Sequence, residues 1–524
     1  MTASMLKPSL PGATAAHDSF TNLLRAEWTK FRTVRGWGIA VVIATLLTIL
    51  LGVWTGAKSH NECPTGPCHW VLPTGPGGEA VTDTFYFVHR PLTRGGSITA
   101  EVTSLSGVIE TDLTPQGPAS TEPAVVPWSK AGLIITASGR PGSAYAAVMV
   151  TGSHGAAMQW NYTGDAAGLP GRVSAASPRW LRLVRAGDVI TGYDSADGAR
   201  WAKIGTVTLP GLASTVQAGL FVTSPPGSVT TSSGITGGSG SGDPTDATAV
   251  FTRVSLRSGR PGAAWTGTTV SGGGNSPFEA GSEHGYRRAD GSLIVTGTGD
   301  IAPDVTDGTP IDGSLAGMFI GLIAMVVIGA LFVTAEYRRG LIRVTLAASP
   351  RRGRVLAAKA IVLGAVTFAA GLAGAAGAIL IGTPLLRANG NTIYPVTMLT
   401  EVRVIAGTAA LVAVAAIFAL GLGVILRHGA AAVTVVITAI IVPYLLAAAF
   451  PVLPAGAADW LLRVTPAAGF AIKQTIPQYP QVAASYTPSQ GYFPLEPWAG
   501  FAVLCGYAAV ALALAAYLLN RRDA

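Results

Sequence analysis

The sequence predicts an α-helical polytopic membrane protein with one all-β extracytoplasmic domain inserted after its first transmembrane helix. Two observations lead to this prediction. Only 12% of the 524 residues are charged and 49% are hydrophobic, whereas soluble domains carry about 25% charged residues. In addition, helix-length apolar runs are missing between residues 57 and 313, where short β-branched and aromatic stretches alternate with Gly, Pro, Asp and Ser.

Six runs reach the roughly 20 apolar residues that a helix needs to cross about 30 Å of hydrocarbon. They lie at 38–54, 315–334, 355–385, 404–426, 430–450 and 499–519. The third is long enough to tilt or break. No small-residue cleavage site closely follows the first, so we interpret it as a retained anchor rather than a signal peptide.

The distribution of basic residues predicts the orientation. The net charge of +8 comes from short segments beside the apolar runs, while residues 57–313 hold 16 basic and 20 acidic residues. Cytoplasmic flanks retain Lys and Arg, so both termini and residues 335–354 are predicted to be cytoplasmic and 57–313 extracytoplasmic, in a cell membrane. Because the largest polar region is mildly acidic, nucleic acid is not an expected partner.

The chain divides into five predicted segments. They are an amphipathic helix with the first transmembrane helix (1–56), a connector (57–79), a β-sandwich (80–257), a Gly/Ser-rich connector or small second lobe (258–313) and five transmembrane helices (314–524). A Gly/Ser/Thr-rich insert at 224–248 is expected to be a flexible loop.

Cysteine placement fits this orientation. Cys63 and Cys68 lie on the predicted outer side, where an oxidising compartment favours a disulfide between them. A metal site with His60 and His69 is the alternative. Cys505 lies within an apolar run and is expected to be inert.

Three stretches of the β region resemble the concanavalin-A-like, laminin-G-like sandwich family: 131–135, 178–188 and 192–201. The resemblance implies a jelly-roll fold, with Trp201 packed against a hairpin. Trp160, Tyr162 and Tyr193 are candidates for stacking on a sugar, although such residues on alternating strand positions also form cores. Asp194 and Asp197, the nearest acidic pair, fit turn chemistry better than glycoside hydrolysis.

Two predicted cytoplasmic segments carry the most specific pattern. The first, 24–35, is predicted to be a short helix with Leu23, Leu24 and Trp28 on its apolar side. The second, 335–359, follows the second apolar run. Together they resemble the type-2 ABC permease family. The resemblance is carried by Leu24, Glu27, Trp28 and Lys30 in the first segment, and by Glu336, Tyr337, Gly340, Ile342, Thr345, Leu346, Pro350, Arg351, Arg352, Val355 and Lys359 in the second. The predicted site residues are Glu27, Trp28, Lys30 and Arg32 of the N-terminal interfacial helix, and Glu336, Tyr337, Arg338, Arg339, Gly340, Arg343 and Pro350 of the ATPase-coupling segment.

That resemblance implies the permease subunit of an ABC exporter, in which residues 335–354 contact an ABC ATPase subunit. The sequence contains no Gly-x-x-x-x-Gly-Lys-Ser/Thr loop, so the chain is not expected to be an enzyme or to bind a cofactor itself, and ATP and Mg²⁺ would act through the partner. A homodimer or heterodimer of permeases is expected. A secondary transporter is disfavoured because the apolar runs hold few ionisable residues. The alternative function is a membrane-anchored glycan-binding or sensor protein without transport.

Overall fold

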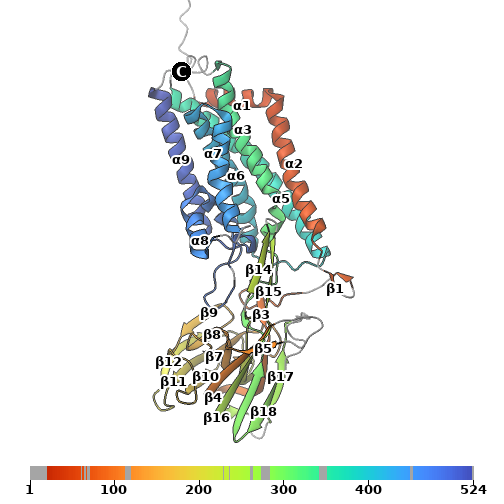
Figure 1. Cartoon of the computed structure of the whole chain (residues 1–524), viewed down its shortest axis with the longest axis vertical. Coiled ribbons are helices and arrows are strands. Elements are labelled where there is room, and N and C mark those ends of the chain that lie inside the picture. The colour runs from red at the N-terminus through yellow and green to blue at the C-terminus, as the bar shows by residue number, and fades with distance from the viewer. Residues whose placement is uncertain are drawn as a thin grey trace, which may run out of the picture.

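The structure is a computed structural model that describes residues 20–521 except 61, 64–65, 68–70, 112–119, 228, 235–236, 260–263, 273–283, 342–350, 449–452 and 485. A bundle of long helices and a β domain lie end to end along the long axis (Figure 1). Helix α1 (Phe20–Thr33) and the C-terminal end of α9 (Pro497–Arg521) lie at the end of the bundle farthest from the β domain. We call this the α1 end, and the opposite end of the bundle the β end.

Within the described residues, six helices are long and apolar enough to cross a membrane. They are α2 (Arg35–Lys58), α3 (Met318–Arg338), α5 (Arg352–Ala388), α6 (Met398–Leu426), α7 (Gly429–Ala448) and α9 (Pro497–Arg521). Each of the six predicted runs coincides with one of these helices to within a few residues, which confirms the prediction of a polytopic helical protein. The third run does not break: it forms one helix of 37 residues that includes Pro384.

Helix α6 is the centre of the bundle and contacts α3, α5, α7 and α9. Small residues allow this packing. A Cβ atom on Gly329 of α3 would lie 2.3 Å from the carbonyl oxygen of Ala416 on α6, so only glycine fits there. Helix α2 is far less enclosed: 17% of its most apolar 18 residues are buried, against 67% for α6. One side of α2 is therefore left uncovered by its own chain.

Among the residues that the structure describes, four short helices lie at the β end of the bundle. At the β end, α8 (Ala455–Val464), η3 (Pro466–Lys473) and η4 (Pro488–Gln490) connect α7 to α9, and η2 (Ile311–Leu315) leads from the β domain into α3.

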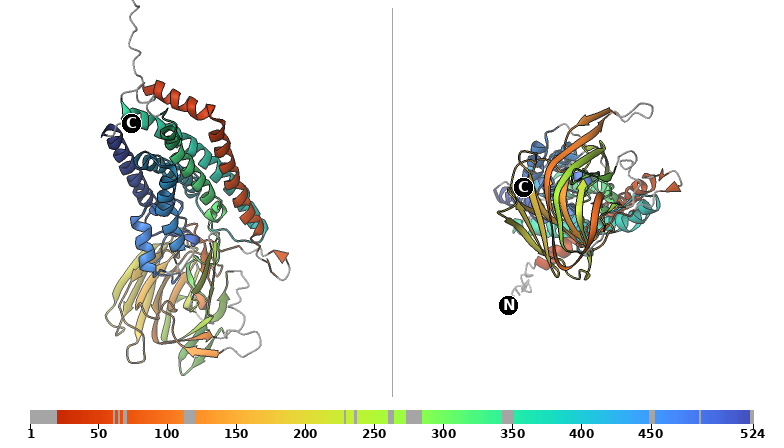
Figure 2. Two further views of the ribbon diagram at one scale, coloured as in Figure 1. Left: turned by 45° about the horizontal axis from the view of Figure 1, so that its top comes forward. Right: turned by 90° about the horizontal axis from the view of Figure 1, so that it is seen from below.

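The β domain is built on strand β4 (Phe85–Thr111), which pairs with β5, β10, β13, β16 and β17 along its 27 residues. The other strands of this 14-stranded antiparallel sheet are β5 (Ser120–Pro123), β6 (Lys130–Thr136), β7 (Tyr145–Thr151), β8 (Ala156–Trp160), β9 (Gly164–Ala167), β10 (Arg179–Ala186), β11 (Val189–Ser195), β12 (Ala202–Thr208), β13 (Val216–Thr223), β16 (Thr245–Gly259), β17 (Thr266–Val270), β18 (Gly285–Ala289) and β19 (Ser292–Gly297). The main order is β12-β11-β10-β4-β13-β6-β7-β8-β9. The strands curve around a core of alternating apolar residues (Figure 2).

Two Gly-rich stretches are more ordered than expected. Instead of a flexible loop, the insert at 224–248 contains the antiparallel pair β14 (Val229–Gly234) and β15 (Gly237–Gly242). In the segment 258–313, β17 pairs with β4, and β18 and β19 form a hairpin on β16 around Asp290 and Gly291, both at positive φ. Strand β20 (Ile301–Pro303) pairs with β3 (Val81–Asp83). The described part of 258–313 therefore extends the β domain rather than forming a separate lobe.

Polar contacts join the β domain to the loops at the β end. The hydroxyl of Tyr394 donates to Oδ1 of Asp304 at 3.2 Å and accepts from the N–H of Gly308 at 2.9 Å. Nε2 of Gln481 donates to the carbonyl oxygen of Tyr162 at 3.0 Å. The domain is thus held by loops that precede α6 and α9 as well as by its own two connections to α2 and α3.

Candidate functional site

Helix α1 is amphipathic and docks through one face on the α1 end of the bundle. Glu27 and Phe31, four residues apart and so on the same face, are buried. Leu24 packs beside the apolar core of the bundle. Trp28 does not belong to this face, contrary to the sequence expectation: its side chain is 49% exposed. The side that docks α1 therefore carries a carboxylate as well as apolar residues.

That carboxylate belongs to a charge cluster that joins three helices. Nζ of Lys359, near the start of α5, lies 2.8 Å from Oε2 of Glu27 and 2.7 Å from Oε1 of Glu336, near the end of α3. Nζ of Lys30 lies 2.9 Å from Oε1 of Glu27 and 3.4 Å from Oε1 of Glu336. We call these two glutamates and two lysines the charge cluster. Its formal charge is zero, and it draws on α1, α3 and α5.

The centre of the charge cluster is enclosed. Lys359 is 1% exposed and Glu27 is 2% exposed. Nζ of Lys359 also lies 4.9 Å from the ring centroid of Phe332, and that ring packs edge-on against Phe31. A buried ammonium group is stable only when carboxylates compensate its charge. Lys359 therefore fixes α1 and the end of α3 relative to α5.

Lys30 covers the charge cluster on its solvent side. Burial lowers the pKa of its ammonium group, but the hydrogen bond and charge of Glu27 together with those of Glu336 outweigh burial, so the pKa is raised above its ordinary value. Lys30 therefore stays protonated at neutral pH.

Helix α3 ends at Arg338, two residues after Glu336. Gly340 has φ +67°, and its N–H donates to the carbonyl oxygen of Tyr337 at 3.2 Å, the left-handed conformation in which many helices end. Arg338 and Arg339 are exposed. The end of α3 thus carries a partly buried acid and two exposed bases.

The remaining predicted residues of this segment have separate outcomes. Tyr337 is half-buried, with the guanidinium of Arg427 at 5.3 Å from its ring centroid. Arg343 and Pro350 lie outside the described residues. On α1, Arg32 is exposed and takes no part in the charge cluster.

A second buried ion pair lies at the β end and was not anticipated from the sequence. Nζ of Lys473, the last residue of η3, lies 3.1 Å from Oδ2 of Asp312 in η2, and both side chains are 5% exposed. Aromatic rings surround the ammonium group at 5.5–6.0 Å: Phe319, Tyr444, Phe470 and Phe493. Asp312 falls in the predicted extracytoplasmic region 57–313, and Lys473 falls between the fifth and sixth apolar runs. In such polar connections solvation is the default expectation. Only the folded chain brings the two together.

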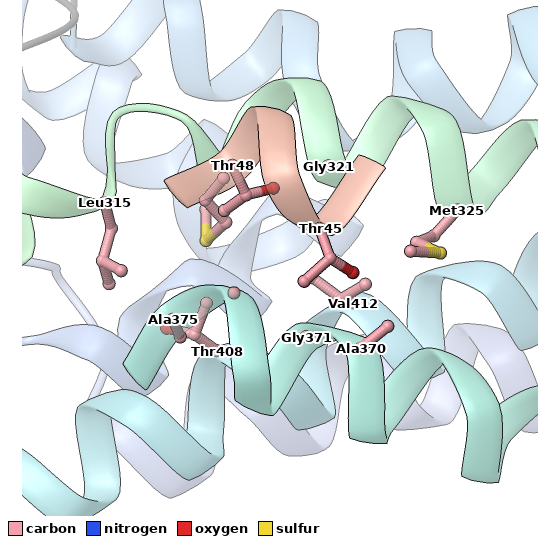
Figure 3. A pocket seen from close by; sticks show the side chains of 12 residues that line it. Thr45, Thr48, Leu315, Gly321, Met325, Ala370, Gly371, Ala375, Thr408 and Val412 are labelled. Carbon is pink, nitrogen blue, oxygen red and sulfur yellow. The ribbon is translucent and has the colours of Figure 1, made fainter. Parts of the chain in front are cut away.

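A small cavity lies inside the bundle where α2, α3, α5 and α6 meet (Figure 3). Its volume is about 20 Å³, close to the space that one water molecule needs. Thr48, Thr408 and Met325 line it. The hydroxyl of Thr48 donates to the carbonyl oxygen of Ala44. The cavity is too small for a transported molecule.

Comparison with known proteins identifies the bundle. A family model described as ABC-2 family transporter protein matches residues 183–524. This is well over half of the chain. The chain belongs to the ABC-2 transporter family. It is therefore a membrane-spanning permease subunit of an ABC transporter, the class that works with an ABC ATPase subunit. Glu336 and Lys359 of the charge cluster lie inside the matched region, whereas Glu27 and Lys30 precede it.

Other comparisons add little about this ABC-2 chain. No curated protein matches it. Solved structures similar to it include a functionally unknown protein from Saccharomyces cerevisiae, with 14% identity, 38% of this chain and 91% of that chain covered, and a TM-score of 0.21. They also include scytalido-glutamic peptidase, with 8% identity, 41% of this chain and 98% of that chain covered, and a TM-score of 0.25. At such scores neither similarity assigns a fold family or an activity.

The proposed sugar-stacking residues of the ABC-2 chain lie in different settings. Tyr162 is buried, and its hydroxyl donates to Oδ2 of Asp83 at 2.6 Å, so its ring belongs to the core. Trp160 is partly buried against the main core of the domain. Tyr193 is half-exposed on β11, opposite Arg182 of β10. The structure does not gather the three into one surface.

The acidic pair of the β domain has structural roles. Asp194 is buried and accepts a hydrogen bond from the N–H of Leu169 at 2.6 Å. Asp197 accepts from the N–H groups of Arg200 and Ala199, and these bonds hold its pKa below the usual range. Trp201, in the next strand connection, lies 3.7 Å below the guanidinium of Arg182. These contacts fit the predicted turn chemistry.

Predictions about the cysteines stay untested. Cys63 lies in the short strand β1 (Glu62–Cys63), which pairs with β2 (Gly66–Pro67), but Cys68 and His69 lie outside the described residues, so the disulfide and its metal alternative do too. Among the described residues no group of three or more His, Cys, Asp or Glu could hold a metal ion. Cys505 is a free thiol on α9.

Proposed function

We propose that this permease subunit belongs to an ABC exporter and that its separate ATPase subunit acts on the α1 end of the bundle. The charge cluster is the observation that carries this proposal. It lies beside the exposed Arg338 and Arg339, the basic residues available to an acidic groove on a partner. The partner would supply the ATP and Mg²⁺ sites, because this sequence lacks a phosphate-binding loop.

The charge cluster offers a physical route for coupling. Moving the end of α3 alone would pull Glu336 away from Lys359 and leave a buried charge without its partner, which costs several kcal/mol. It is more favourable for α1 and α5 to move together with α3. A displacement imposed on α3 by the ATPase is thus shared by three helices, and only two residues separate the start of α3 from η2, which leads to the β domain.

The proposed orientation places the α1 end in the cytoplasm and the β domain outside. The basic residues beside the apolar helices support it, because cytoplasmic flanks retain such residues. The export direction rests on the resemblance of the two basic segments to type-2 permeases. Two permease chains, identical or different, are expected in one transporter.

The proposal is tested by purifying the tagged full-length chain from its native membrane and identifying the proteins that accompany it. We expect an ATPase subunit with a phosphate-binding loop. The double variant R338E/R339E should reduce its recovery at least tenfold. The double variant R287E/R288E reverses two adjacent exposed arginines on β18 and should leave recovery unchanged.

Two results would count against the proposal. One is recovery of the intact wild-type chain without any ATPase, which would favour the glycan-binding or sensor alternative. The other is an equal loss of the ATPase in both double variants, which would mean that the α1 end is not the contact.

A further inference from the structure

The uncovered side of α2 forms one wall of an apolar groove. The groove has a volume of about 490 Å³, within the range of roughly 300–1,000 Å³ typical of ligand sites. Its lining comes from three helices: Trp28 of α1, Val41, Val42, Thr45 and Leu46 of α2, and Ala365, Val366, Ala369, Ala370 and Ala373 of α5. The small residues of α5 create the hollow, because Ala365, Ala369 and Ala373 recur every four residues on one exposed face.

The groove has the length of one membrane leaflet. From Arg35, the first residue of α2, to Leu46 the helix rises about 17 Å at roughly 1.5 Å per residue, and half of the hydrocarbon core is about 15 Å. Thr45 and Ala370 line both this groove and the enclosed cavity in the middle of the bundle. The groove therefore runs from the α1 end to the level of that cavity, whose lining residues Thr45 and Ala370 are labelled in Figure 3.

The mouth of the groove is basic. A second hollow of about 440 Å³ shares Val42 with the groove and extends it to Arg35. Arg25, Arg32 and Arg35 are exposed, and none of them forms a salt bridge with a carboxylate in the described part of the chain. Trp28, half-exposed in the same helix as Arg25 and Arg32, is a residue type that favours the level of lipid headgroups.

We propose that this groove binds a phospholipid with an anionic headgroup from the leaflet on the α1 side. One acyl chain lies along Val42, Leu46 and Ala369, and the headgroup phosphate is held by Arg32 and Arg35. Three free guanidinium groups favour an anionic headgroup over a zwitterionic one, because each cation near the headgroups favours a negatively charged lipid about fivefold. The site requires only that the bundle spans a bilayer, so it does not depend on the proposed coupling to an ATPase.

Bromine atoms on a lipid acyl chain quench the fluorescence of nearby tryptophan side chains, so Trp28 serves as the reporter. The purified full-length chain is titrated in detergent with brominated phosphatidylglycerol or brominated phosphatidylcholine, and the Trp28 signal is the difference between the wild type and W28F. We expect phosphatidylglycerol to quench Trp28 at least fivefold more effectively than phosphatidylcholine. The variants R32A and R35A should each reduce that preference about fivefold.

Matched variants separate the groove from the general membrane surface. Ala369→Phe fills the groove and should abolish saturable quenching by both lipids, while Val510→Phe, on the exposed face of α9, should not. R521A removes an arginine at the end of α9 on the same side of the bundle and should leave the preference unchanged. Thermal unfolding of each variant verifies that it is folded.

Three outcomes would overturn the proposal. Equal quenching by the two lipids would show that the groove does not prefer an anionic headgroup. An unchanged lipid preference in folded R32A and R35A would show that these two arginines do not bind the headgroup. Efficient cross-linking of A369C to a second copy of the chain, without Trp28 quenching, would mean that a partner helix covers the groove instead of lipid.

Discussion

Replacing Lys359 with methionine should destabilise the bundle far more than the same replacement of Lys30. Lys359 is 1% exposed and is the partner of both Glu27, at 2.8 Å, and Glu336, at 2.7 Å. Its loss leaves Glu27 and Glu336 with only the partly exposed Lys30 as a cation, and removing one partner of a buried ion pair costs about 3–5 kcal/mol. Lys30 has 41% of its side chain exposed, so its salt bridges are worth at most about 1 kcal/mol.

The measurement is the free energy of unfolding of the purified chain in detergent, from denaturant titration of the wild type, K359M and K30M. We expect K359M to lose at least about 2 kcal/mol more than K30M. Similar losses in the two variants, or a loss below about 1 kcal/mol in K359M, would refute the inference that the charge cluster fixes the three helices.

A compensated variant separates stability from coupling. The triple variant E27Q/K359M/E336Q removes the two carboxylates together with the buried cation, and neutral replacements of whole buried ion pairs are often tolerated. It should recover most of the stability lost in K359M. If the charge cluster couples the helices, the ATPase complex of this triple variant should still hydrolyse ATP but transport less per ATP than the wild-type complex.

Further predictions concern other buried charges. Lys130 is fully buried, and its Nζ lies 2.5 Å from Oδ1 of Asp300. The variant K130M should lower the free energy of unfolding of the full chain by about 3–5 kcal/mol. A loss under about 1 kcal/mol would contradict this. Burial raises the pKa of Asp83 from 3.8 to about 6, so between these pH values Asp83 is protonated in the folded chain and ionised in the unfolded chain. The free energy of unfolding should therefore fall by about 3 kcal/mol as the pH rises from 4 to 6 and stay lower above pH 6. The variant D83N should remove this part of the pH dependence, and an unchanged pH profile of stability in D83N would contradict the raised pKa. K473M should unfold more readily than D312N/K473M, because only the single variant leaves Asp312 buried without a cation; the reverse order in thermal unfolding would argue against a buried pair.

The membrane helices could be predicted because hydropathy is a property of contiguous residues. The charge cluster could not be predicted, although one of its residues stands out in the sequence. Lys359 is a single charge close to the start of a long apolar run, and it belongs to the pattern that resembles type-2 permeases. Its partners Glu336 and Glu27 lie 23 and 332 residues away in sequence, and only helix packing brings them together.

The β domain shows a second limit of prediction from sequence, which concerns the length of strands. Pro91, Gly95 and Gly96 favour a break between two short strands in residues 84–102, yet β4 runs without interruption through them. Pro91 is paired with Gln217 of β13, and different neighbours pair with successive parts of β4. Such pairing is decided by partners that lie far away in sequence, so local preferences do not determine the length of the strand.

The most direct test of the central claim is ATP hydrolysis by the purified chain, alone and with its ATPase subunit, reconstituted in proteoliposomes. The account predicts no hydrolysis by the chain alone, hydrolysis by the complex, and loss of complex formation in R338E/R339E but not in R287E/R288E. Hydrolysis by the chain alone, or a complex that forms equally well in both variants, would contradict a permease driven through the α1 end of its helices.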